Sequence, residues 1–200
     1  MKLIINLFEF FFARQIFYNL NINLLKLIIR FIGYNNHGSF KESGEIYFLE
    51  KVCSEKPRLC IDIGANVGNY SKYLLENSSS KVFAFEPIPR SFKKLQIIKK
   101  NYLNFFFIFK FGVGEKKSTK IINYNNKNLQ WANFNSEVNK INYLEKNNKK
   151  LKCSIITLDN FAENNKKLLN KKIDLIKIDT EGYEYEVLKG AKKTIQKFKP

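Results

Sequence analysis

The sequence has few histidines, cysteines and glycines. Its 200 residues include 1 His, 3 Cys and 9 Gly. The cysteines form no CxxC pair, so we expect neither a disulfide framework nor a zinc site, and no metal is assigned. Cys60 lies in an apolar run, where a buried thiol is the ordinary case. Unpaired cysteines favour a reducing compartment, and we therefore expect a cytoplasmic protein.

Acidic residues are also scarce, because 18 Asp and Glu face 35 Lys and Arg, which gives a formal charge of +17. Such an excess suits a polyanionic partner, and a basic RNA-binding or RNA-methylating protein is one alternative. In that alternative the aromatic side chains of FFFIFKF would stack on bases. The lysines are scattered among asparagines, however, and the aromatics have strand spacing. We therefore interpret them as a solvated surface and a core, and expect no nucleic acid partner.

No long uncharged apolar run is present. Residues 1–32 are apolar and aromatic, but Glu9, Arg14, Lys26 and Arg30 interrupt them. A spanning helix needs about 18 apolar residues, so none is predicted, and no secretory signal is recognised. One interpretation is a weak contact with a membrane surface through an amphipathic helix. The interpretation that we favour is a helical extension packed on the domain or on a second subunit.

From residue 58 onward, short apolar runs alternate with longer segments of helical spacing. This alternation predicts an α/β fold with a mostly parallel sheet. We expect an N-terminal helical extension over 1–42 and a single Rossmann-like domain over 43–200. The strands are predicted at 58–63, 81–85, 105–109, 120–124, 152–157 and 173–178. The helices are predicted at 67–76, 90–100, 158–169 and 187–197, and a polar loop with some helix at 125–150.

The stretch CIDIGANVGN combines a strand end, two glycines and a helix start. Gly64 suits a tight turn and Gly68 a close approach between the helix and the strand, and the helix start offers free amide groups. Asp62 is expected to anchor either the loop or the sulfonium end of a cofactor through hydrogen bonds to backbone amides, and not to take part in the chemistry. Asn66 stands where a dinucleotide site prefers glycine, so a cofactor with adenosine but without phosphates fits better. That cofactor is S-adenosylmethionine.

Two further groups of acids follow later strands. Glu86 ends the strand VFAFE, where a carboxylate can accept hydrogen bonds from both ribose hydroxyls. Asp179 and Glu181 follow DLIKI and are expected to face the same crevice. We predict Asp179 as the general base or the group that orients the acceptor hydroxyl, with Glu181 second. The alternatives are that Glu181 and Glu184 only favour the start of the next helix, or that Asp179 and Glu181 hold Mg²⁺. Asp159 is expected to cap its own helix.

The segments CIDIGANVGNYSKYL, VFAFEPIPRSFKKLQ, ITLDNF and IDLIKIDTEGYEYEVLKGA occur in this order. Together they resemble the FkbM family of S-adenosylmethionine-dependent O-methyltransferases, over residues 43–200. The resemblance implies a Rossmann-like methyltransferase sheet and, as acceptor, a hydroxyl of a sugar or another small metabolite or glycan. The chain stops at Pro200, directly after the last predicted helix. We therefore expect the family's last strands to be missing, and a truncated, inactive interaction module is a further alternative.

Overall fold

The structure is a computed structural model that describes residues 6, 9–31, 44–125, 148–165 and 172–200. The chain divides into two compact units, residues 1–48 and 49–200, and each is described by itself.

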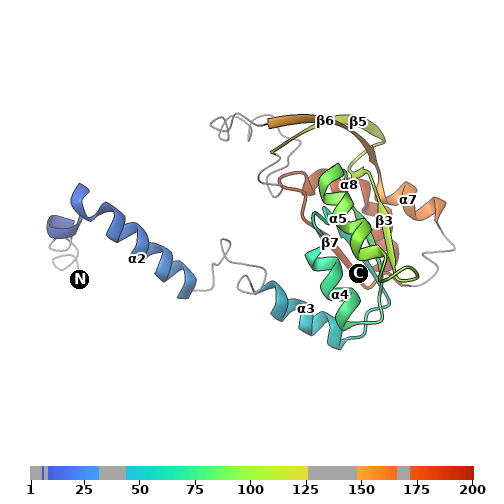
Figure 1. Ribbon diagram of the computed structural model, residues 1–200, viewed down its shortest axis with the longest axis horizontal. Coiled ribbons are helices and arrows are strands. Elements are labelled where there is room, and N and C mark those ends of the chain that lie inside the picture. Colours follow the sequence, from blue (N-terminus) through green and yellow to red (C-terminus); the bar gives the residue numbers. More distant parts are fainter. Residues whose placement is uncertain (1–5, 7–8, 32–43, 126–147, 166–171) are drawn as a thin grey trace. The chain divides into compact units, whose positions relative to one another are not determined.

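The first unit contains helices only among its described residues. These are the helical residues 9–12, the short 3₁₀ helix η1 (Gln15–Phe17), the α-helix α2 (Tyr18–Phe31) and the beginning of α3 (Glu45–Ser54). Helix α2 falls within the extension that the sequence predicts (Figure 1). In the described part of the chain, no helix combines the length and the apolarity that crossing a membrane requires.

The second unit is built on a four-stranded parallel sheet. Its strand order is β3-β2-β1-β7, with β1 at Leu59–Ile63, β2 at Lys81–Phe85, β3 at Phe106–Phe109 and β7 at Leu175–Ile178. All three neighbouring pairs are parallel. The prediction of an α/β fold with a mostly parallel sheet is thus confirmed. The chain order reverses between β1 and β7, and ligands of open α/β sheets bind at such a switch point.

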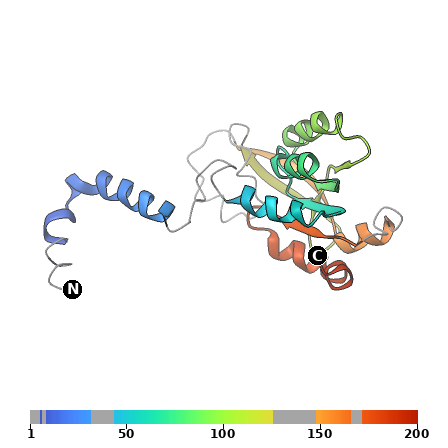
Figure 2. The ribbon, with the colours of Figure 1, turned by 90° about the horizontal axis from the view of Figure 1, so that it is seen from below.

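Helices cover both faces of this sheet (Figure 2). The helices α4 (Asn69–Asn77) and α5 (Pro89–Lys99) lie on one face. The other face carries α7 (Leu158–Asn164), α8 (Glu184–Gly190) and α9 (Lys192–Phe198). Alternate strand residues point to opposite faces. The larger core lies on the α7 to α9 side and includes Leu59, Ile61, Ile63, Phe83, Phe85, Phe161, Val187 and Ala191.

A second, smaller sheet has the order β4-β6-β5. It consists of β4 (Gly112–Val113), β5 (Ser118–Asn125) and β6 (Asn148–Ile156). β5 runs antiparallel to β6, whereas β4 runs parallel to it. The two longer strands were predicted, although β6 begins earlier than expected, and β4 was not predicted. Most of the polar segment predicted as loop and helix lies outside the described residues.

Most rings of the aromatic run FFFIFKF belong to the core, whereas Phe105 at its start is exposed. Phe106 is fully buried, and Phe107 and Phe109 pack against the larger core. The ring centroids of Phe83 and Phe107 are 4.8 Å apart, and those of Phe85 and Phe109 are 5.0 Å apart. These rings are therefore part of the sheet's packing and not a platform for bases.

The end of the chain corrects one prediction about its helices. The sequence predicts a single helix, but α8 ends at Gly190 and α9 begins at Lys192. A β-carbon on Gly190 would collide with the carbonyl oxygen of Gly114, so only glycine fits where α8 ends against this backbone. Within α8, Val187 is buried whereas Leu188 is exposed.

Asp159 caps a different helix from the one predicted. Its carboxylate accepts hydrogen bonds from the backbone amides of Lys193 at 3.1 Å and Thr194 at 2.8 Å, in the first turn of α9. Its own helix is capped by Thr157, whose hydroxyl accepts from the amide of Asn160 at 3.0 Å. Asp159 therefore ties two helices together across the core.

Candidate functional site

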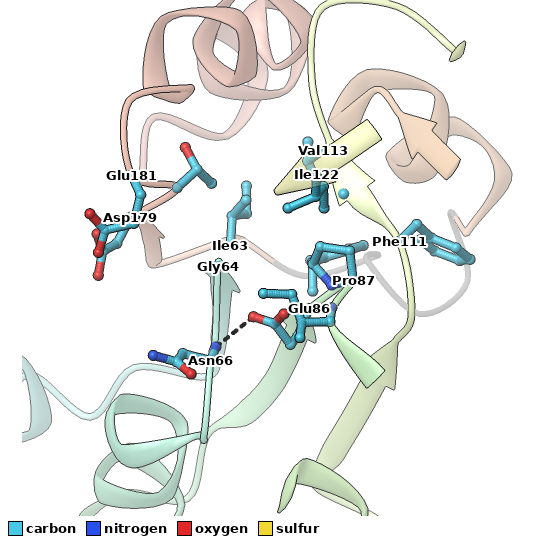
Figure 3. Close-up of a pocket in the computed structure, with 14 residues that line it drawn as sticks. Ile63, Gly64, Asn66, Glu86, Pro87, Phe111, Val113, Ile122, Asp179 and Glu181 are labelled. Carbon is cyan, nitrogen blue, oxygen red and sulfur yellow. Dashed lines mark hydrogen bonds between the residues drawn. The ribbon is translucent and has the colours of Figure 1, made fainter. Parts of the chain in front are cut away.

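A pocket of about 590 Å³, measured to its open mouth, lies where β1, β2 and β7 end (Figure 3). Its opposite wall comes from the segment around β4 and from β5. The position is the switch point of the parallel sheet, where ligands of open α/β sheets bind. The lining residues are Ile63, Gly64, Asn66, Phe85, Glu86, Pro87, Ile88, Phe111, Gly112, Val113, Ile122, Asp179, Thr180 and Glu181.

The loop after β1 needs its glycines for two different reasons. Gly64 has φ of +78°, and a β-carbon there would overlap the carbonyl oxygen of Asp179. Gly68 has φ of +88°, and its β-carbon would lie 2.6 Å from Leu95 in α5. The missing side chain at Gly68 thus allows α5 to pack closely against the loop. The sequence suggested instead that it allows α4 to approach the preceding strand. Asn66 also has positive φ, at 49°, a conformation that asparagine tolerates better than most residues.

The amides of this loop are already used within the protein. Gly64 and Ala65 donate to the carbonyl of Phe85 at 3.0 and 3.1 Å, and Gly68 donates to Ala65 at 2.8 Å. Asn66 donates to the carboxylate of Glu86 at 2.8 Å. The start of α4, where we expected free amides, does not line the pocket. These four loop amides therefore offer no cradle for a phosphate group.

Glu86 connects the loop to the end of β2. One carboxylate oxygen accepts from Asn66, and the other accepts from the amide of Ile88 at 2.7 Å. The residue is only 4% exposed. Burial raises the pKa of Glu86 to about 7, although the two amide hydrogen bonds oppose the rise. Ser91 completes the loop by donating to the side-chain oxygen of Asn66 at 3.1 Å.

Asp62 lies below the loop and outside the pocket lining. It is fully buried, accepts from the hydroxyl of Ser71 at 2.6 Å and lies 3.1 Å from the ammonium of Lys177. The amide hydrogen bonds that the sequence predicts for Asp62 are made by Glu86 instead. Asp62 thus holds helix α4 and strand β7 together beneath the site.

Lys177 is the residue that joins these parts. Besides Asp62, its ammonium donates to the carbonyl oxygen of Gly64 at 3.0 Å and lies 3.5 Å from the carboxylate of Asp179. Burial alone would lower the pKa of Lys177, but Asp62 and Asp179 raise it above its ordinary value. The side chain therefore stays charged at neutral pH, and one cation contacts the loop, a buried acid and a pocket acid.

The turn after β7 brings two acids to the pocket. Asp179, Thr180 and Glu181 line it, and Figure 3 shows Asp179 and Glu181 on the same side. Desolvation, followed by the charges of Asp179 and Glu184, raises the pKa of Glu181. Glu184 does not line the pocket. Its carboxylate accepts from the amides of Thr180 at 2.8 Å and Gly182 at 3.1 Å, so it shapes the turn from within.

Comparison with known families gives a match over the same residues. The model of the methyltransferase FkbM domain matches residues 62–200, which include the loop, Glu86 and the acidic turn. The chain belongs to the FkbM methyltransferase family. The family predicted from the sequence motifs is thereby confirmed.

Comparison with curated proteins finds no match. Among solved structures, the FkbM chain is similar to an rRNA methylase from Streptococcus thermophilus, with 20% sequence identity and a TM-score of 0.29. The similarity covers 34% of this chain, and it spans 39% of the methylase chain.

The predicted site residues of the FkbM domain differ in whether they line the pocket or support it. Gly64, Asn66, Glu86, Asp179 and Glu181 line it directly. Gly68 lies against Leu95 of α5. Asp62 lies outside the pocket and supports the loop from below.

Sequence reasoning did not single out Lys177. A signal existed, because Lys177 interrupts the apolar strand LIKI at an alternate position, as Asp62 does in LCIDI. The two residues are register partners between β1 and β7.

Proposed function

We propose that the FkbM domain binds S-adenosylmethionine in this pocket and transfers its methyl group to a hydroxyl. The observation that carries the proposal is the state of the loop after β1. Its amides donate to Phe85, Glu86 and Ala65, which leaves them unsuited to the pyrophosphate of a dinucleotide. A cofactor with an adenosine part and no phosphates avoids this requirement.

The residues around the pocket fit such a cofactor. Each oxygen of Glu86 accepts one backbone amide, and a carboxylate oxygen can accept a second hydrogen bond, so both ribose hydroxyls can be served. The apolar side chains of Ile88 and Phe111 offer a surface for an adenine ring. The acidic turn with Asp179 and Glu181 lines another part of the pocket and is left to face the acceptor.

S-adenosylmethionine, when bound, supplies an electrophilic methyl group on a positively charged sulfur. The protein has to orient the acceptor oxygen and take its proton. We assign this role first to Asp179, which lines the pocket and is held by Lys177. Glu181 is the second candidate, because its raised pKa makes it a stronger base than an ordinary glutamate. A positioned general base contributes about 10² to 10⁴ in rate.

The acceptor that we propose is a hydroxyl of a neutral sugar, of another small metabolite or of a glycan. The pocket mouth carries the carboxylates of Asp179 and Glu181, which suit hydroxyl donors and repel the phosphates of a nucleic acid. Phe107, Phe109 and Phe111 of the run FFFIFKF pack against the core and are not available for stacking on bases. We expect the reaction to take place in the cytoplasm.

Calorimetry with S-adenosylmethionine and with NAD tests the cofactor assignment. We expect S-adenosylmethionine to bind, NAD not to bind, and Glu86→Gln to weaken the affinity at least about tenfold, because a hydrogen bond to a charged group is lost. A protein that binds NAD, or neither compound, contradicts the proposal. Transfer of a labelled methyl group to a panel of sugars and glycans then tests the acceptor class.

A further inference from the structure

Helix α2 exposes an unusually large apolar surface. Its sequence is YNLNINLLKLIIRF. Leu24 is 53% exposed and Leu25 is 50% exposed, and the same surface includes Leu20, Leu27, Ile28 and Phe31. The helical residues 9–12, which precede η1, add Phe10 and Phe11, which are 66% and 54% exposed. Contiguous apolar surface of this extent marks a site of interaction.

The polar side of α2 is narrow. At about 100° per residue, Asn19, Asn23 and Lys26 fall within an arc of about 60°, and apolar residues occupy most of the remaining circle. Asn21 lies outside this arc, but its side-chain amide donates to the carbonyl of Phe12 at 2.9 Å. A helix that packs on one core needs an apolar stripe of about 100° only. An environment that surrounds the helix on nearly all sides suits α2 better.

The charge of the helix indicates which environment this is. The sequence of α2 contains Lys26 and Arg30 and no acidic residue. The whole chain carries a formal charge of +17, which disfavours the approach of a second copy. Anionic lipid headgroups, by contrast, attract basic residues next to an apolar helix.

The length of the helix decides how it meets a bilayer. Its 14 residues extend about 21 Å at 1.5 Å per residue. The hydrocarbon core of a bilayer is about 30 Å thick, so the helix is too short to cross it. A helix of this length lies in the interface, with aromatic residues such as Phe10 and Phe11 at the same depth.

We propose that α2 docks the protein on an anionic membrane surface. The apolar arc enters the boundary of the acyl chains, and the side with Asn19, Asn23 and Lys26 faces the headgroups. This proposal is independent of the cofactor and acceptor assigned to the second unit. It places the FkbM domain at a lipid surface, where acceptors that carry a lipid are concentrated.

Sedimentation of the full chain with lipid vesicles tests this proposal. We expect binding to vesicles of phosphatidylcholine with phosphatidylglycerol, weaker binding to pure phosphatidylcholine, and a loss of this difference at high salt. Leu24→Ser with Ile28→Ser removes two apolar side chains one turn apart. We expect this pair to lower the partition coefficient more than about tenfold. Asn19→Ser with Asn23→Ser is the matched pair on the polar side and should retain binding.

Three results would overturn the proposal. The first is that the wild-type chain does not sediment with phosphatidylglycerol vesicles. The second is that the apolar and polar variant pairs bind equally well. The third is that the wild-type chain forms a dimer, or packs α2 on residues 49–200, and releases it in the Leu24→Ser, Ile28→Ser variant without any lipid binding. Gel filtration detects a dimer, and thermal unfolding detects packing of α2 on residues 49–200. Far-ultraviolet circular dichroism checks that both variants fold.

Discussion

Lys177 and Asp62 form an ion pair of 3.1 Å inside the parallel sheet, between residues that are register partners on β7 and β1. Asp62 is fully buried, and the side chain of Lys177 is only 15% exposed. The same ammonium reaches the carbonyl of Gly64 and the carboxylate of Asp179. The pair therefore links the stability of the sheet to the geometry of the pocket.

Removing one partner of this pair should cost more than removing both charges. We expect Lys177→Met to lower the free energy of unfolding by about 3 kcal/mol or more, because it leaves the buried Asp62 carboxylate without its cation. The double variant Asp62→Asn with Lys177→Met should be less destabilised than the sum of the two single changes. Urea unfolding measures all three.

Lys172→Met is the matched control, because Lys172 pairs with Asp174 at 4.0 Å with its side chain 69% exposed. An exposed pair contributes less than about 1 kcal/mol. Equal losses for Lys172→Met and Lys177→Met, or strict additivity in the double variant, would contradict the role of the buried pair.

Gly64→Ala should be severely destabilising. The added β-carbon overlaps the carbonyl of Asp179, so β1 and β7 have to separate. We expect a loss of about 3 kcal/mol or more in the free energy of unfolding, with a loss of cofactor binding. Gly44→Ala is the control that separates backbone strain at positive φ from the collision of the added β-carbon. Gly44 has a similar φ of +81°, but a β-carbon added there would have no atom within 4 Å, so we expect about 1 kcal/mol. Similar losses at both positions would show that backbone strain alone matters.

The pKa of Glu86 predicts a pH dependence with opposite signs for stability and for binding. Burial raises this pKa from 4.5 to about 7, so the folded state binds the proton more tightly than the unfolded state. The stabilising contribution is fully present below pH 4.5 and is lost as the pH rises to about 7, an effect of about 3 kcal/mol. Urea unfolding across this range should show it, and Glu86→Gln should remove it.

Cofactor affinity should change the other way, because the ionised carboxylate is the better acceptor for ribose hydroxyls. We expect S-adenosylmethionine to bind more tightly at pH 8 than at pH 6, by about tenfold. Calorimetry at the two values measures this change. An affinity that is independent of pH in the wild type, or a dependence that persists in Glu86→Gln, would exclude Glu86 as its source.

The two pocket acids should differ from Glu86 in what they affect. We expect Asp179→Asn to retain the affinity for S-adenosylmethionine within about threefold and to lower kcat by about 10² or more. If Asp179 is the base, Glu181→Gln should lower kcat less than Asp179→Asn does. If Glu181 is the base, Glu181→Gln should lower kcat more. Methyl transfer to an identified acceptor, measured against pH, decides between them. Full turnover in both variants would remove the acidic turn from the chemistry.

The strands of the parallel sheet were predictable because each is a short and mostly apolar run, with Asp62 in β1 and Lys177 in β7 as single polar interruptions. A parallel strand that is covered on both faces has no polar side to interrupt its pattern. The run at 58–63 thus predicts β1 at Leu59–Ile63 closely, and the predicted bounds of β2 agree with the structure. The pocket followed from the same logic, since Gly64, Glu86 and Asp179 stand at the ends of three such strands.

Features that depend on pairing between distant segments were not predictable. Strand β4 has two residues, too few for a pattern. The role of Lys177 depends on the register between β1 and β7, which neither strand encodes alone. Asp159 precedes a helical pattern and was therefore interpreted as the cap of that helix, whereas its partner amides lie in α9. The break after Gly190 reflects the neighbouring backbone of Gly114 and leaves the helical spacing of the sequence intact.

The pairing of β1 with β7 also bears on the order of folding. The amide of Leu59 bonds to the side chain of Asp174, a residue 115 positions away. Closing so long a loop costs chain entropy before any contact is gained, and contacts of high sequence separation slow folding. The segment of β7 and the turn after it supply the Asp179 carbonyl next to Gly64, the Lys177 partner of Asp62 and the acidic turn. All three are therefore in place only after β7 has paired with β1. Competence to bind a ligand should therefore appear only in the slowest kinetic phase, so that a binding signal during refolding reports the completed sheet and not the collapsed chain.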